Sequence, residues 1–256
     1  SGNGFIYSAA AGTLTVTSTA TGTPSHVYGD APTASFGYTL TGFADAEDNA
    51  GNISIAGSPG FNLPGLVSDA GSYAVSYVSG LSSGAGYNFN AGAGLAYTVS
   101  QAPLNITAIN QGKVYGEVLS FGGTEFLATG LKNSQTVGDV TLASSGAAAV
   151  ANVGSSPYVI TPSAAKGGSF NSANYSITYV DGALAVTARP LTVSFTAPTK
   201  TYDGNPTAPV GAFVLNNVVN GDSLGLLGTA VAAYDSRHVG TAKPVSYSGL
   251  ALGGGA

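Results

Sequence analysis

The sequence predicts a mainly β protein of tandem small modules, each a β-sandwich (Ig-like) or β-grasp-like fold, arranged end to end as an elongated rod. The first observation is a period. Tyr28, Tyr115 and Tyr202 each lie beside a glycine and an acid, at equal spacings (115 − 28 = 87; 202 − 115 = 87). The second is a series of short segments in which apolar and polar residues alternate. The third is a composition that disfavours helices and suits strands with many turns.

The composition indicates a folded protein with few charges and no disulfides. The 256 residues include 38 glycines and 12 prolines, and only 7% are charged, against about 25% in ordinary soluble domains. Hydrophobic residues still make up 44%, which is enough for packed cores and argues against disorder. The chain has no cysteine, which excludes disulfides and thiolate metal sites.

Charge and hydropathy argue against two classes of partner. The net charge is −5, and the seven basic residues are scattered: Lys113, Lys132, Lys166, Arg189, Lys200, Arg237 and Lys243. Such a distribution cannot follow a phosphate backbone, so we expect no nucleic-acid partner. No apolar run reaches the roughly 18 residues of a membrane helix, so we expect no membrane insertion. The chain begins with Ser1 and has no signal-peptide pattern, so we expect it to be an excised piece of a longer protein.

Three kinds of strand recur in each repeat. Opening strands with alternating apolar residues are expected at 14–17, 103–107 and 190–194. A second strand follows each tyrosine motif, at 35–40, 125–129 and 212–215. A third strand, at 73–78, 158–161 and 245–248, follows a recurrent glycine corner that begins at Asp69, Asn152 and His238. In the third repeat, Asp222 is placed to cap a single helical turn.

The first two repeats are predicted to close with a hairpin, at 87–99 and 175–187. In the second, Asp181-Gly182 lies between alternating runs and fits a type I′ turn. The third repeat ends 19 residues short of a period and lacks a counterpart of 170–188. We interpret this as truncation, with a neighbouring copy's hairpin as the alternative.

These features predict four segments. Residues 1–12 form the tail of a preceding region, followed by modules at 13–102, 103–188 and 189–256, the last truncated before its closing hairpin. The connections between modules are only a few residues long, which restricts bending.

No constellation of residues predicts catalysis, which needs a nucleophile–base pair or paired carboxylates. His26 and His238 have no common context, and we interpret both as turn histidines near the surface. The acidic loop Asp45-Ala46-Glu47-Asp48-Asn49-Ala50-Gly51-Asn52 offers oxygen ligands for calcium. It lacks a spaced calcium pattern and is not repeated, so we favour a solvated loop. We therefore predict no enzyme, no catalytic residue, no metal site and no cofactor.

The repeated acids Asp30, Glu117 and Asp203 are interpreted as parts of a structural corner. Beside glycine in a turn, their side chains can accept local backbone N–H bonds. The tyrosine ring would pack while its hydroxyl finds a partner. A ligand site is the alternative, with its residues unknown. The chain has 14 tyrosines, most of which we expect in cores, although exposed ones can stack on sugars.

The ordered motifs over about residues 13–256 resemble the MBG and YDG repeats of large bacterial adhesins of the filamentous-haemagglutinin, two-partner-secretion kind. Tyr28-Gly29-Asp30 and Tyr115-Gly116-Glu117 look like the MBG form, with Glu117 a departure from the usual Asp. Tyr202-Asp203-Gly204 looks like the YDG form. The closing signature from Asn174-Tyr175 to Thr187 fits well, whereas Gly86-Tyr87-Asn88 fits less well. The resemblance implies a secreted or outer-surface stalk and no activity.

Two functions follow as expectations. The first is a structural stalk segment of a secreted bacterial fibrillar adhesin, projecting a distal binding region in cell adhesion or biofilm formation. Its partners would be a secretion partner in the outer membrane and, by self-association, further copies. The second is a module that binds exopolysaccharide, other surface glycans or extracellular matrix through repeat avidity.

Overall fold

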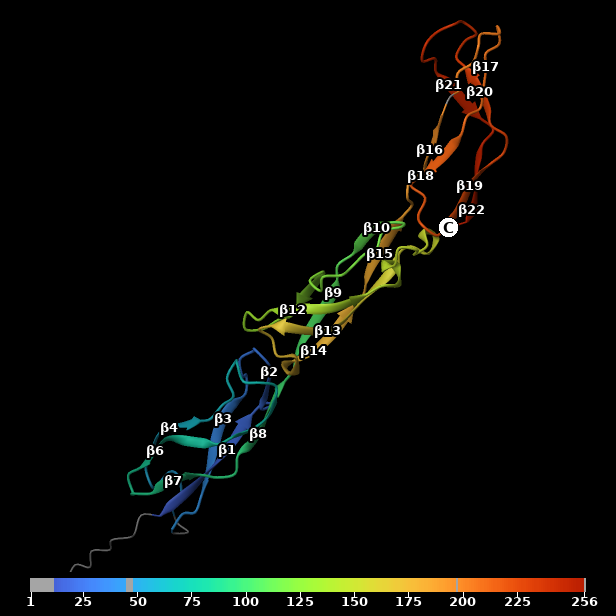
Figure 1. The fold of residues 1–256 in the computed structure, drawn as a ribbon. Helices are drawn as coiled ribbons and strands as arrows, with labels where there is room; N and C mark the ends of the chain where they lie inside the picture. The colour runs from blue at the N-terminus through green and yellow to red at the C-terminus, as the bar shows by residue number, and fades with distance from the viewer. Residues whose placement is uncertain (1–11, 45–47, 197, 256) are drawn as a thin grey trace, which may run out of the picture. The chain divides into compact units, whose positions relative to one another are not determined.

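The structure is a computed structural model that describes residues 12–44, 48–196 and 198–255 (Figure 1). Its elements are strands joined by turns, with three 3-10 turns at Ser145–Ala147, Val153–Ser155 and Ser172–Asn174. No α-helix occurs in these residues, so the predicted mainly β class is confirmed. For the same residues, no helix has the length and apolarity needed to cross a bilayer.

The chain divides into two compact units, and the division passes through the second repeat. The first unit contains the residues up to Ile106 together with 127–140 and 164–179. The second contains 107–126, 141–163 and 180–256.

The first repeat forms small mixed sheets. Its strands are β1 (Thr13–Thr21), β2 (Ser25–Val27), β3 (Ser35–Thr41), β4 (Ile55–Phe61), β5 (Gly71–Val75), β6 (Tyr77–Ser83), β7 (Asn88–Ala91) and β8 (Leu95–Ser100). The sheet orders are β3-β1-β7 and β2-β8-β5, and β4 pairs with β6. β1 pairs with β3 antiparallel but with β7 parallel, and β2 runs parallel to β8. Leu14 and Val16 of β1 and Tyr97 and Val99 of β8 are buried. Alternate residues of both central strands thus build a sandwich-like core.

The second repeat reuses this plan. Its strands are β9 (Ala102–Ala108), β10 (Gln111–Val114), β11 (Phe126–Thr129), β12 (Val137–Ala143), β13 (Tyr158–Gly168), β14 (Tyr175–Val180) and β15 (Gly182–Thr187). The sheet orders are β11-β9-β14 and β10-β15-β13-β12, so β9 takes the place of β1 and β15 that of β8. Leu104 and Ile106 of β9 are fully buried, as is Leu184 of β15.

The third repeat is less complete. Its strands are β16 (Thr192–Phe195), β17 (Thr207–Ala208), β18 (Phe213–Asn216), β19 (Ser223–Leu227), β20 (Val231–Tyr234), β21 (Val245–Ser248) and β22 (Ala251–Gly255). Over the described ranges, β16 pairs with β18 alone, whereas β1 and β9 have a strand on each side. The hydrophobic residues buried in the described part of this repeat are Ala208 and Ala232. Large apolar side chains such as Phe195 and Leu252 remain about half exposed.

Both predicted closing hairpins are wrong. β14 belongs to the sheet of β9, while β15 belongs to the sheet of β10 and β13; β7 and β8 are separated in the same way. A tight I′ turn would keep both strands in one sheet, but Gly182 is not among the glycines with positive φ. Its backbone instead runs close to another segment, since a Cβ there would lie 2.7 Å from the Ala108 carbonyl oxygen. Asp181-Gly182 therefore carries the chain from one sheet to the other.

Two smaller predictions are also corrected. The strand expected at 73–78 is interrupted at Ser76, because β5 pairs with β8 whereas β6 pairs with β4. Asp222 caps no helical turn, because the residues after it form β19, which pairs with β22. The remaining predicted opening and second strands lie within a few residues of β1, β9, β16, β3, β11 and β18.

Two predictions fall on residues outside the described ranges. Apart from Gly12, the tail predicted for residues 1–12 is among them. So are Asp45, Ala46 and Glu47 of the acidic loop considered for calcium.

Candidate functional site

The recurrent tyrosine corners are the candidate site. In the described part of the chain, no three histidine, aspartate or glutamate side chains come together as a metal site would require. Asp48, of the acidic loop, accepts a hydrogen bond from the Tyr87 hydroxyl at 2.6 Å.

A basic residue lies two positions before each tyrosine, and in the second and third corners its ammonium group binds backbone carbonyl oxygens. His26, Lys113 and Lys200 are spaced by one period (113 − 26 = 87; 200 − 113 = 87). The Lys113 ammonium donates to the carbonyl oxygens of Glu117 and Ala148. The Lys200 ammonium donates to the carbonyl oxygens of Asn205 and Thr207. This position was not among the predicted corner residues, although the 87-residue spacing marks it.

His26 corrects the prediction that both histidines lie in surface turns. It is in β2, only 7% exposed, with Nδ1 2.7 Å from the Tyr97 hydroxyl. The alternation of β2 directs this side chain into the core, where the tyrosine supplies the hydrogen bond that a buried polar group needs. His238 is exposed outside any strand, as expected.

The first corner is covered. Tyr28 is 3% exposed, and its backbone N–H donates to the Ser100 carbonyl at 2.8 Å, at the end of β8. Its ring meets the Tyr175 ring edge-on, with centroids 5.6 Å apart. Asp30 forms an ion pair with Lys132 at 2.7 Å. The predicted packing of the ring is confirmed, but the acid bonds to a distant side chain rather than to local backbone.

The second corner is partly covered. The Tyr115 backbone N–H donates to Thr187 at the end of β15, and its hydroxyl donates to Asp222 Oδ1 at 2.7 Å. This hydrogen bond to Asp222 raises the pKa of Tyr115. Glu117 Oε2 accepts the backbone N–H of Val114 at 3.1 Å, which is the local bond predicted for the acid.

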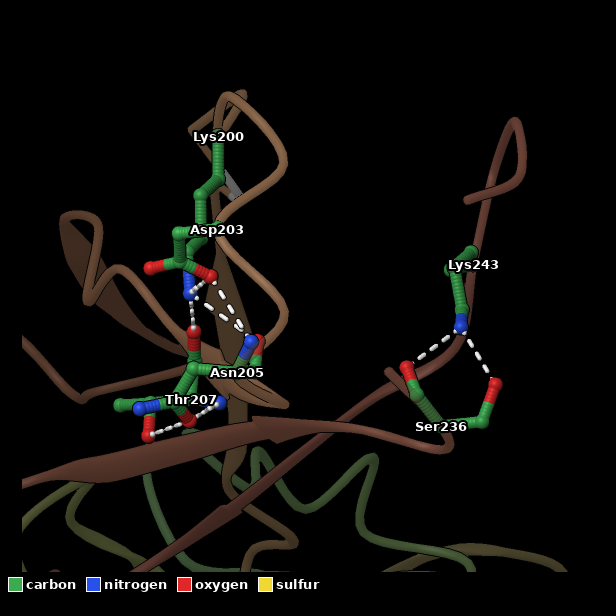
Figure 2. A network of polar contacts seen from close by, with 6 residues as sticks. All are labelled: Lys200, Asp203, Asn205, Thr207, Ser236 and Lys243. Carbon is green, nitrogen blue, oxygen red and sulfur yellow. Dashed lines mark hydrogen bonds and ion pairs between the residues drawn. The ribbon is translucent and has the colours of Figure 1, made fainter. Parts of the chain in front are cut away.

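The third corner is open. Tyr202 is 63% exposed, so the predicted packing of this ring is wrong. Polar contacts within the loop are shown in Figure 2: Asp203 Oδ1 pairs with Lys200 at 2.8 Å and accepts the Asn205 N–H at 2.9 Å. Asn205 in turn accepts from the backbone and hydroxyl of Thr207. The hydrogen bond from Lys200 lowers the pKa of the Asp203 carboxyl.

A hollow of about 510 Å³ adjoins this corner, lined in part by Tyr202, Asn205 and His238. On its other side, Lys243 donates to the backbone and hydroxyl oxygens of Ser236, as Figure 2 shows, and to the His238 carbonyl. Asp235 pairs with Lys243 at 3.0 Å. Lys200 and Lys243 are thus each paired with an aspartate, and the hollow offers a polar rim and an exposed ring.

Two repeats with a shared strand order, and a tyrosine corner with a glycine and an acid in all three, define a protein of tandem β-modules. Comparison with family models matches residues 104–185 to the MBG domain (YGX type) and residues 187–256 to the YDG domain. The chain therefore belongs to the proteins that contain MBG and YDG domains, and the resemblance of its motifs to these two repeats is confirmed over the two matched ranges. The YGX description leaves the third position open, so Glu117 is compatible with it. No match was found among curated proteins or among solved structures.

Proposed function

We propose that the chain is a non-enzymatic stalk segment of a secreted bacterial fibrillar adhesin, projecting a distal binding region in cell adhesion or biofilm formation. One observation carries this proposal. β8 ends at Ser100 and β9 begins at Ala102, while β15 ends at Thr187 and β16 begins at Thr192. Connections this short leave little free chain for bending between repeats. Membership of the MBG and YDG families supports a repeat-type surface module.

The proposal includes location and partners. The protein would lie outside the cell or on its surface, exported through an outer-membrane partner of the two-partner-secretion kind. Self-association of neighbouring stalks is compatible with the low charge, since only 7% of residues are charged and long-range repulsion is weak.

Small-angle X-ray scattering of the whole chain tests the stalk. We expect a pair-distance distribution with a long tail and a cross-section close to that of one repeat. A symmetric distribution, typical of a compact particle, would contradict the proposal. Scattering at several concentrations separates self-association from the shape of a single chain.

A second candidate function rests on the third corner. Tyr202 presents an exposed ring beside a hollow with polar groups, which is the combination that a sugar face and its hydroxyls can use. We propose exopolysaccharide or other surface glycans as ligands, with weak sites adding by avidity. A glycan array should show binding that Tyr202→Ala abolishes and Tyr179→Ala, at another exposed tyrosine, retains. Binding at background level by the parent protein would remove this candidate.

A further inference from the structure

The glycine of each covered corner lies against the following repeat. A Cβ added to Gly29 would lie 2.5 Å from Lys132 Cβ, and one added to Gly116 would lie 2.5 Å from Val219 Cγ2. The two receiving residues occupy the same position of their repeats, since 219 − 132 = 87. Two successive corners thus meet the same place on the next repeat, through residues of different chemistry.

Further contacts surround the first of these meeting points. Asn174 of the second repeat is only 1% exposed; it donates to Asp69 Oδ1 at 2.7 Å and accepts the Ala70 N–H at 2.8 Å. Asp69 and Ala70 belong to the recurrent glycine corner before β5. The Gln101 amide donates to the Ala173 carbonyl at 2.9 Å. A buried amide satisfied by the neighbouring repeat requires that repeat to stay in place.

At the second meeting point, the acidic residue of the contact lies on the receiving repeat and not on the corner. On this receiving side, Asp222 accepts a hydrogen bond from the Tyr115 hydroxyl at 2.7 Å. At the first point the acid Asp30 is on the corner and the cation Lys132 receives it. The steric contact at glycine is therefore the shared element, and the charges differ from one point to the next.

We infer that the tyrosine–glycine corner is the docking element that locks each repeat onto the next, and that Lys132 and Val219 mark its receiving position. Both glycines have positive φ, +80° and +90°, so glycine suits the turn and also admits the neighbour. Gly204 has only the first of these two features: its φ is +79°, but nothing lies within 4 Å of the position that a Cβ would take. The inference concerns fixation of one repeat by the next, and it stands whether or not the protein is a stalk.

Distance measurements by double electron–electron resonance on the whole chain test whether the corner fixes one repeat to the next. The chain has no native cysteine, so spin labels can be attached at Thr39→Cys in β3 and Thr178→Cys in β14, which are both exposed. We expect a narrow distance distribution in the parent. Gly29→Val should broaden it by pushing against Lys132. Gly204→Val, which imposes the same backbone strain without a neighbour, should leave it unchanged.

A charge exchange tests the receiving side without altering glycine. Lys132→Asp places a second carboxylate opposite Asp30 and should broaden the distribution. Combining it with Asp30→Lys should restore the narrow one, and this arm remains informative if Gly29→Val fails to fold. The inference is overturned if Lys132→Asp leaves the distribution narrow, if the exchange does not restore it, or if Gly204→Val broadens it as much as Gly29→Val.

Discussion

Glycine has two roles in this chain: it adopts positive φ in turns, and it lets another segment approach closely. Only the first role can be predicted from the local sequence. Gly29 and Gly116 adopt positive φ in a turn, which the motif itself indicates. Gly182 lies in a turn-like dipeptide, after Asp181, yet its role is to let β15 start close to Ala108. The neighbour is 74 positions away along the chain (182 − 108 = 74), so no local pattern reports it.

Gly182→Val should destabilise the second repeat. Its Cβ would lie 2.7 Å from a carbonyl oxygen, and backbone cannot yield as a flexible side chain does. We expect a loss of about 1–3 kcal/mol in the free energy of unfolding, measured by urea denaturation. Gly225→Val, at a strand position with nothing within 4 Å, is the matched control. Equal losses in both variants would show that the close approach is unimportant.

Two aspartates make the third repeat sensitive to acid. Hydrogen bonds from Lys200 and Lys243 lower the pKa of Asp203 and of Asp235, respectively. Because folding depresses these pKa values, the stabilisation is present above the ordinary aspartate pKa and is lost as the pH falls through the folded value.

Asp203→Asn and Asp235→Asn should therefore reduce the loss of stability that the parent protein shows as the pH falls. Thermal unfolding of parent and variants, followed from neutral pH to below about pH 4, should differ most at neutral pH and converge in acid. A difference that stays constant over this range would contradict the assignment. Asp139→Asn removes a longer ion pair, 3.6 Å from Lys166, and serves as the control.

At the scale of elements, the strands were largely predictable and their partners were not. Alternation located β1, β9 and β14, because a buried face imposes a period of two on any strand. The same alternation fits a hairpin and a crossover between two sheets equally well. Burial of Leu184 in the second sheet, opposite β9, decided for the crossover.

The third repeat should accept a closing pair of strands. Among the residues that the structure describes, β16 has no counterpart of the parallel partner that β7 supplies to β1. Apolar side chains around Val193, Phe195 and Leu252 line a hollow of about 370 Å³. Fusing a second copy of the sequence 170–188 after Ala256 should raise the melting temperature of this repeat. Covering two or three such side chains contributes about 3 kcal/mol or more.

The control fusion replaces the residues of the added segment that correspond to Leu184 and Val186 by aspartate. It keeps the length and the backbone but cannot cover apolar surface. If both fusions changed the melting temperature equally, the added segment would not be filling the core.

At the scale of the whole molecule, the repeats should differ in local stability. The first two bury several large residues completely, among them Leu14, Tyr97, Leu104 and Leu184, whereas the described buried hydrophobic residues of the third are alanines. Local opening is easier where little apolar surface is buried. Unfolding of the chain is then expected in more than one step.

Hydrogen exchange followed by mass spectrometry measures this directly. Amides of β16 to β22 should exchange faster than those of β9, β14 and β15 under native conditions. Peptides covering β1 and β8 provide an internal reference for a complete repeat. Uniform protection across all three repeats would contradict the expected order.

The sequence by itself determined the period, the mainly β class, the family and the positions of the corners. The class and the corners depend on composition, alternation and turn residues, which act over a few neighbouring positions, and the period follows from the spacing of the corners. Only the tertiary structure decided which strands pair, that closing strands change sheets, and that two corners are covered while the third is open. Those outcomes rest on contacts such as Asp30 with Lys132 and Tyr115 with Asp222, 102 and 107 residues apart in the chain. Alternation states which side of a strand is buried, but the residue it is buried against is set by packing at long range.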